Sequence, residues 1–339
     1  MTLRLGTRAS ALATAQSSGI ARALTEATGR DVELVPIVSE GDASRASLSS
    51  LGGTGVFATR LREALLAGEC DLLVHSLKDL PTAPAPGLRI GAIPEREDAR
   101  DLVVTRGSAL QQLPAGATVG TGSPRRIAQV RTRAPRVSLV DLRGNVDSRL
   151  ARVRDGELDA VVLAAAGLLR LGVLDESGTI APAGPGAGLS FEAMGLAEWP
   201  TAAGQGALAV EIAADAPDDI VAAVAALEHP DTRLAVTAER AVLAELEAGC
   251  HAPVGVHAQV EGEDLRIRAI VYGTDGASRL GIDRTEPLGA GYIRDSGDGN
   301  GADVADGADP IARAALIGSA IARRLLLRGA ADLVSRESS

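Results

Sequence analysis

The chain has 339 residues, of which 46% are hydrophobic and 23% are charged, so it can build packed cores and is not expected to be disordered. Its formal net charge of −10 argues against a general binder of nucleic acid or of acidic membranes. An aromatic content of 1% also argues against recognition of single-stranded nucleic acid by base stacking, and the length favours two or three domains.

The first half of the sequence alternates strand and helix patterns. Ala11 to Thr28 is predicted to be a helix that begins after the N-cap Ser10 and ends at Gly29. Strands are expected at residues 3–6, 32–38, 71–75, 102–105, 118–121, 137–142 and 159–164, and further helices at 56–67, 124–133 and 146–155. This alternation indicates βαβ units with mostly parallel sheets, which bind ligands at the carboxyl ends of their strands.

A weak internal repeat predicts two similar α/β domains. Residues 5–10 and 119–126 both read as a strand, then Gly-Thr, Arg and Ser, then a helix. A strand region within 199–212 is expected to return the chain to the first domain. The last third predicts a small α+β domain with a helix at 237–248, antiparallel strands at 254–260, 265–272 and 278–284, a Gly/Asp-rich loop at 289–307 and a helix at 309–328. We therefore expect domains at 1–96 with 196–212, at 97–195 and at 213–339.

Arginines recur where predicted strands end. Ser123 and Pro124 are good helix starters, yet Arg125 and Arg126 follow in the first turn, where the helix dipole disfavours cations. A docked anion would explain them, although arginines on an ordinary surface would give the same pattern. Similar strand ends carry Arg8, Arg143, Arg149 and Arg170. Together they predict a cleft for a ligand with several carboxylates.

A unique lysine follows another predicted strand. Lys78 is the only lysine in the chain, and it stands beside Asp79 in His75-Ser76-Leu77-Lys78-Asp79-Leu80-Pro81. Lys78 could form a Schiff base or bind a carboxylate, and Asp79 could transfer protons or stabilise a cation. A structural Lys–Asp pair that caps a turn is the alternative.

The two cysteines differ in their expected surroundings. Cys250 lies in a loop bounded by Gly249 and Pro253, where an accessible thiol could be a nucleophile, an attachment point or an unreactive group. Cys70 leads into a buried strand and is expected to be inert. Two cysteines form no disulfide framework, and neither they nor the histidines show metal-ligand spacing, so we expect no metal and a reducing compartment.

Eight segments in the same order resemble the porphobilinogen deaminase family, over residues 3 to about 271. They are Thr7–Ser10, Val74–Pro81, Pro94–Asp101, Gly120–Arg126, Leu142–Val146, Leu163–Gly172, Gly204–Ala207 and Glu247–Gly255. The resemblance implies two α/β domains similar to type II periplasmic binding proteins, which face each other across a cleft, and a small α+β C-terminal domain.

The resemblance also implies an activity. Family members are cytoplasmic transferases of tetrapyrrole and haem biosynthesis that join four porphobilinogen molecules head to tail into hydroxymethylbilane and release ammonia. Cys250 matches the cysteine that holds a dipyrromethane cofactor by a thioether, and Asp79 matches the catalytic carboxylate. The cofactor is also contacted through positions that match Ser76, Lys78, Asp79, Ser123, Arg125, Arg126 and Arg143, and the substrate through Arg8, Ser10, Arg149 and Arg170.

Some positions depart from the family pattern. Thr54 and Thr59 stand where a basic residue is common, and the Gly/Asp-rich loop is longer. Two other hypotheses are a non-catalytic carboxylate-binding protein, which leaves Cys250 and Asp79 without a role, and a Schiff-base enzyme that uses Lys78. We expect a cytoplasmic monomer, without a leader segment, that binds neither nucleic acid nor a membrane.

Overall fold

A computed structural model describes residues 2–37, 56–175, 177–246, 253–273, 276–289 and 309–334. These residues form two compact units, one of residues 1–97 and 204–233 and one of residues 98–203 and 234–339. Each unit is made of separate stretches of the chain, because the chain passes between the units after residues 97, 203 and 233. The expected division into three domains stays a prediction.

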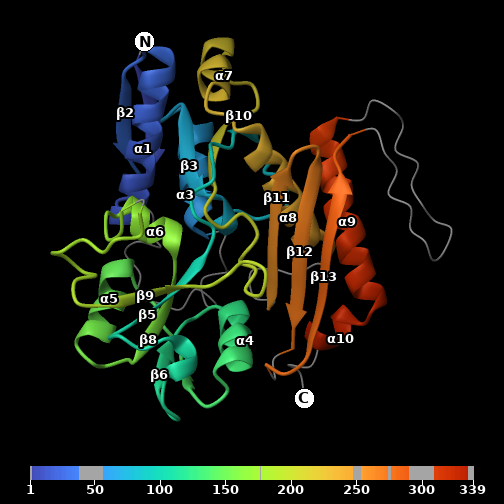
Figure 1. Ribbon diagram of the computed structural model, residues 1–339. Coiled ribbons are helices and arrows are strands. Elements are labelled where there is room, and N and C mark those ends of the chain that lie inside the picture. Colours follow the sequence, from blue (N-terminus) through green and yellow to red (C-terminus); the bar gives the residue numbers. More distant parts are fainter. Residues whose placement is uncertain are drawn as a thin grey trace. The chain divides into compact units, whose positions relative to one another are not determined.

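The first unit is a five-stranded sheet with helices (Figure 1). The strand order is β2-β1-β3-β10-β4. Its elements are β1 (Leu3–Thr7), α1 (Ala11–Thr28), β2 (Val32–Pro36), α3 (Val56–Leu66), β3 (Leu72–Ser76), the 3-10 helix η1 (Leu77–Asp79), β4 (Leu88–Ala92), β10 (Leu208–Ala213) and α7 (Asp218–Ala225). Helix α1 has the predicted ends: Ser10 accepts a hydrogen bond from the Ala13 amide, and Gly29 is left-handed with φ 69°.

The second unit contains a sheet of the same design. Its order is β7-β6-β8-β5-β9. The elements are β5 (Asp101–Thr105), η2 (Leu110–Gln112), β6 (Thr118–Gly120), α4 (Pro124–Arg133), β7 (Ser138–Val140), α5 (Val146–Arg154), β8 (Ala160–Ala164), α6 (Ala165–Arg170) and β9 (Ser190–Ala193). In both sheets the first three strands are parallel and the last two pairings are antiparallel. The predicted internal repeat is therefore a repeat of topology.

The expectation of mostly parallel sheets is only half right, because both sheets are mixed. The reason is where the chain enters each sheet. Strand β10 begins beside the last residue of β3, with Leu208 opposite Ser76, and β5 begins with Asp101 opposite Ala164, the last residue of β8. A strand that starts at the carboxyl edge of its neighbour must run antiparallel to it.

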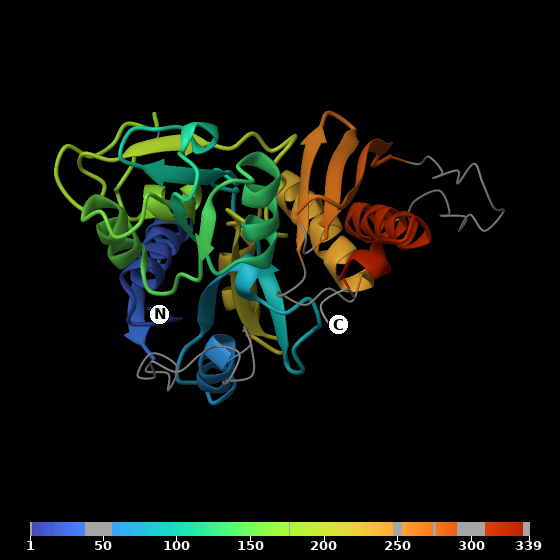
Figure 2. The ribbon, with the colours of Figure 1, turned by 90° about the horizontal axis from the view of Figure 1, so that it is seen from below.

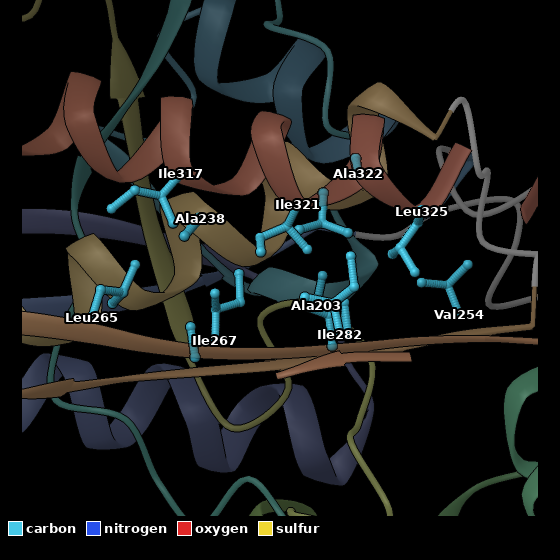
Figure 3. Packing of buried hydrophobic residues seen from close by; sticks show 14 of the residues in the cluster. Ala203, Ala238, Val254, Leu265, Ile267, Ile282, Ile317, Ile321, Ala322 and Leu325 are labelled. Carbon is cyan, nitrogen blue, oxygen red and sulfur yellow. The ribbon is translucent and has the colours of Figure 1, made fainter. Parts of the chain in front are cut away.

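The three predicted antiparallel strands form a sheet, which belongs to the second unit. It consists of β11 (Val254–Glu261), β12 (Asp264–Tyr272) and β13 (Arg279–Pro287). Helices α8 (Pro230–Glu245) and α9 (Pro310–Leu327) lie on one face of it, and α10 (Ala330–Val334) follows α9 (Figures 1 and 2). Figure 3 shows side chains of α8 and α9, among them Ala238, Ile317 and Ile321, pointing toward Leu265 and Ile267 of the sheet.

Several elements are missing from the sequence-based expectations. Strands β4 and β9 lie next to Pro- and Gly-rich segments that read as loops, and α7 has no strong start signal. Helix α8 begins at Pro230, well before the expected 237, because its cap is a histidine: the Thr232 amide donates to His229 Nδ1 at 3.2 Å. Among the described residues, no helix is both long and apolar enough to cross a bilayer.

Close packing between α8 and α9 depends on a glycine. A Cβ at Gly318 would collide with the Ala238 carbonyl and approach the Ala241 Cβ to 2.8 Å. We expect Gly318→Ala to lower the free energy of unfolding by about 1–3 kcal/mol, because the helices must move apart. A Cβ at Gly19, in the interior of α1, would have no atom within 4 Å, so Gly19→Ala should raise it by about 0.5–1 kcal/mol. Urea denaturation of both variants tests these two predictions. A free energy of unfolding of Gly318→Ala equal to that of the parent would contradict the first.

Candidate active site

The carboxyl edge of the first sheet gathers five of the predicted site residues. Strands β1 and β3 are parallel neighbours, so both end at this edge. Arg8 and Ser10 follow β1, and Ser76, Lys78 and Asp79 lie at the end of β3 and in η1. Asp79 is exposed and Lys78 is half-buried. The edge therefore presents two cations, two hydroxyls and one carboxylate.

Gln16 joins helix α1 to the end of β3, and the sequence analysis did not select it. Its Nε2 donates to Ser76 Oγ at 2.9 Å, which links α1 to the end of β3. Gln16 is 7% exposed and lies on the same face of α1 as the buried Ile20 and Leu24. A polar residue in the apolar stripe of a helix is the signal that could have identified it.

The loop of residues 204–207 supports the η1 turn. Lys78 Nζ donates to Gln205 Oε1 at 3.2 Å, and the Leu77 amide donates to the Ala207 carbonyl at 3.0 Å. Gly204 has φ +74°, and a Cβ there would lie 2.9 Å from Leu77 Cγ. This loop, one of the eight segments that carry the family resemblance, packs closely against η1 and thereby positions Lys78 and Asp79 at the sheet edge.

A buried charged cluster lies one residue before the site. His75 Nε2 donates to Glu211 Oε2 at 3.1 Å, and Arg62 binds the same carboxylate through Nε and Nη2. Burial alone would raise the pKa of Glu211, but the bonds from His75 and Arg62 hold it below its ordinary value. These hydrogen bonds connect β3, β10 and α3 at the residue that precedes Ser76.

The second sheet carries its cations at the start of α4. Ser123 accepts a hydrogen bond from the Arg126 amide and Pro124 is the first helical residue, as predicted. Arg125 and Arg126, however, are not surface residues: they are 4% and 8% exposed. The position of α4 after β6 puts both at the carboxyl edge of this sheet.

Both guanidinium groups bind one buried carboxylate. Asp101 is fully buried and accepts from Arg125 Nη1 at 2.8 Å, from Arg126 Nη2 at 2.6 Å and from Trp199 Nε1 at 2.9 Å. Burial would raise the pKa of Asp101, but the two arginines lower it far below its usual range. Sequence reasoning missed Asp101 as a partner, because it lies on a different strand and only the fold brings it to α4.

This cluster keeps an excess of positive charge. Two guanidinium groups face one carboxylate, and the Nε atoms of Arg125 and Arg126 are buried without a hydrogen-bond partner among the described residues. Burial lowers the pKa of Arg149, and the nearby charge of Arg126 lowers it further. Such a concentration of cations with unused donors favours an anion.

The other predicted arginines of this unit lie on segments that follow β7 and β8. Arg149 is half-buried in α5, and its Nε donates to the Gly144 carbonyl at 2.8 Å. Arg143 is exposed, with its Nε 3.5 Å from Asp141 Oδ2. Arg170 is half-buried at the end of α6, which follows β8.

The cysteine that the structure describes is Cys70. Cys250 and Thr54 lie outside the described residues, and Thr59 is exposed on α3. Cys70 is 2% exposed, and burial raises the pKa of its thiol to about 11, so it is protonated at neutral pH and unsuited to nucleophilic attack. Among the described residues no group of three or more His, Cys, Asp or Glu could hold a metal ion.

Comparison with known proteins assigns the family. Residues 3–221 match the model of the porphobilinogen deaminase, dipyromethane cofactor binding domain, and residues 233–289 match the porphobilinogen deaminase C-terminal domain. The chain belongs to the porphobilinogen deaminase family. The first of the two matches spans both mixed sheets, so the strand edges with the arginines and Asp79 fall within the region that the family model describes as cofactor-binding.

Relatives named porphobilinogen deaminase match nearly the whole chain. The protein of Leifsonia xyli is 51% identical over 338 residues, which are 98% of this chain and 94% of that protein. Porphobilinogen deaminase 1 of Streptomyces coelicolor is 52% identical and covers 84% of this chain and 88% of its own. Among solved structures, a periplasmic substrate-binding protein of an ABC transporter from Coxiella burnetii matches 67% of this chain and 92% of its own, with 14% identity and a TM-score of 0.39.

The Asp101 cluster generates a prediction about stability. Asp101→Asn leaves two buried guanidinium groups without a counter-charge, so we expect the free energy of unfolding to fall by about 3–5 kcal/mol. Because the pKa of Asp101 is lowered in the folded state, its contribution is complete above the ordinary aspartate pKa of about 4 and is lost as the pH falls further. Denaturation at neutral pH and in acid measures both effects.

A surface aspartate provides the control. Asp155 forms an exposed pair with Arg154, and Asp155→Asn should change stability by less than about 1 kcal/mol. Equal losses in the two variants would contradict the assigned role of Asp101.

Proposed function

We propose that this chain is a hydroxymethylbilane synthase, a transferase that condenses four porphobilinogen molecules head to tail and releases ammonia. The observation that carries the proposal is the buried excess of positive charge at the start of α4, formed by Arg125 and Arg126 over the single carboxylate of Asp101. Porphobilinogen carries an acetate and a propionate, and each added unit brings two more carboxylates. Membership of the porphobilinogen deaminase family supports the same substrate.

The residues present fit a dipyrromethane cofactor. The Nε donors of Arg125 and Arg126, which have no partner among the described residues, the hydroxyl of Ser123 and the exposed Arg143 suit its carboxylates. We infer that Cys250 holds the cofactor through a thioether, since it stands in the connection between the end of α8 and the start of β11 and the other cysteine is buried. When bound, the dipyrromethane would supply the free pyrrole carbon to which the first substrate is joined.

Asp79 is the carboxylate for the chemical step. It is exposed at the sheet edge beside Lys78, whose ammonium is held by Gln205. A carboxylate in this position can stabilise the positive charge that develops when the aminomethyl nitrogen leaves, and can accept a pyrrole proton. On the same edge, cofactor carboxylates would be bound by Ser76 and Lys78, and substrate carboxylates by Arg8 and Ser10. In the second unit, substrate carboxylates would be bound by Arg149 and Arg170.

The state of the protein in the cell forms a second part of the proposal. We propose a cytoplasmic monomer that acts on its small-molecule substrate without nucleic acid or membrane. The net charge of −10 and a sequence with only two cysteines support this assignment. Size-exclusion chromatography with light scattering measures the oligomeric state directly.

Intact mass spectrometry tests the cofactor assignment. We expect protein purified from cells to carry two linked pyrrole units on a peptide that contains Cys250, and Cys250→Ser to be unmodified and nearly inactive. Cys70→Ser is the matched control, because the Cys70 thiol is buried and its replacement should leave an active protein with a modified Cys250. An active parent with a bare Cys250 would overturn the assignment, and borohydride trapping of an aldehyde or ketone on Lys78 would support a Schiff-base enzyme instead.

A charge substitution tests Asp79. Asp79→Asn keeps the shape of the side chain and removes its charge, so turnover of porphobilinogen should fall by about two orders of magnitude or more while the protein stays folded. Asp79→Glu retains the charge in a displaced position and should keep more activity than the Asn variant. Steady-state kinetics with circular dichroism measures both, and turnover of Asp79→Asn near the parent rate would rule out the carboxylate mechanism.

A further inference from the structure

A single buried amide links the arginine pair to the three-stranded sheet. Gln129, one turn after Arg125 in α4, is 2% exposed. Its Oε1 accepts from Arg125 Nη1 at 2.7 Å. Its Nε2 donates to the Pro200 carbonyl at 2.8 Å and to the Tyr272 hydroxyl at 3.1 Å. Gln129 thus bridges a site arginine and strand β12.

The orientation of this amide is determined by its partners. A guanidinium group can only donate, so the oxygen of Gln129 must face Arg125 and the NH₂ group must face the carbonyl and the hydroxyl. Both amide hydrogens and the oxygen are used in a place without solvent. A side chain of equal size without the oxygen would leave Arg125 with one fewer partner, and one without the NH₂ group would do the same to the Pro200 carbonyl.

Tyr272 receives this bridge at the end of β12. It is 1% exposed, and it packs with Ile270 against Ala128 of α4. Its backbone amide donates to the Pro253 carbonyl at 2.9 Å, and Pro253 is the third residue after Cys250. The same residue therefore holds the segment just after Cys250 through its backbone and the support of Arg125 through its side chain.

A second connection runs through the segment after Trp199. The Val256 amide of β11 donates to the Thr201 carbonyl at 2.8 Å, and Trp199 Nε1 donates to Asp101. Pro200, between these two residues, is the carbonyl that Gln129 binds. The strand that follows Cys250 and the carboxylate that holds both arginines are consequently joined by three consecutive residues.

We propose that Gln129 and Tyr272 are positioning residues, which fix Arg125 relative to Pro253, a described residue that follows Cys250 in the chain, so that the guanidinium group can bind the carboxylates of pyrroles attached to the thiol. This inference rests on the proposed function and adds to it two residues that act through Arg125 and the segment after Cys250. The bridge acts before turnover, because the cofactor must be seated before any substrate is joined.

The test follows the loading of cofactor onto the full chain. Protein is produced in cells that cannot make porphobilinogen, then incubated with porphobilinogen, and the gain of covalent mass is recorded with time. Gln129→Met keeps the volume and removes the amide, and should slow loading at least about tenfold, since small displacements of a binding group have large kinetic effects. Tyr272→Phe removes one hydroxyl and should slow loading by a smaller factor of about two to five.

Thr132→Val is the matched control. Thr132 Oγ1 lies 2.8 Å from the Gly276 carbonyl, so this residue also joins α4 to the segment after β12, but its hydrogen bonds do not involve Arg125. The control should load at the parent rate, with all proteins compared below their unfolding temperatures. Equal slowing of all three variants, or parent-like loading of both Gln129→Met and Tyr272→Phe, would overturn the inference.

The outcomes also separate this inference from the proposed function. A parent chain that gains no mass from porphobilinogen contradicts the proposed function itself, and the positioning role with it. A parent that loads while Gln129→Met and Tyr272→Phe load equally well leaves the function intact and removes only the positioning role. Should Gln129→Met not fold, Tyr272→Phe against Thr132→Val decides the question.

Discussion

The rest of this structure depends on one interaction, in which two nearly buried guanidinium groups share one fully buried carboxylate. A buried charge is costly unless it is paired, and Asp101 with Arg125 and Arg126 balances only half of the positive charge. The surrounding backbone and side chains make up part of the difference: Arg126 Nη1 donates to the Val162 carbonyl, and Arg125 to Gln129. In the proposed function, a bound anion would balance the remaining charge and offset the cost of burying the cations.

The route of the chain explains why such a cluster forms at a strand edge. Ligand sites in α/β proteins lie at the carboxyl ends of parallel strands. Here the strand that enters each sheet from the other unit starts at that same edge, β10 beside β3 and β5 beside β8. The first residue of β5 is Asp101, so the connection between units itself delivers the carboxylate to the helix that begins after β6.

Local signals make part of this structure predictable. Helix α4 begins where expected, because Ser123 is its N-cap and Pro124 its first residue. Helix α1 has the expected N-cap, Ser10, and ends at the expected left-handed glycine, Gly29. The direction of β10, the pairing of Asp101 with α4 and the histidine cap of α8 depend on contacts between distant segments or on an unusual capping residue. Sequence periodicity carries no information about these, so the pattern alone left open whether Arg125 and Arg126 lie on a surface, and only the fold shows them buried against a carboxylate.

The order of the strands has a consequence for how the protein folds during synthesis. Strand β4 is complete at Ala92, yet among the described strands it pairs only with β10, which begins at Leu208. As the chain leaves the ribosome, the backbone N–H and C=O groups of β4 therefore have no partner strand until all strands of the second mixed sheet have been synthesised. During that interval β3 also has an unpaired edge, which can bind a strand of another chain. The mixed sheet of the first unit is therefore completed later than that of the second unit, although the first unit contains the N-terminus.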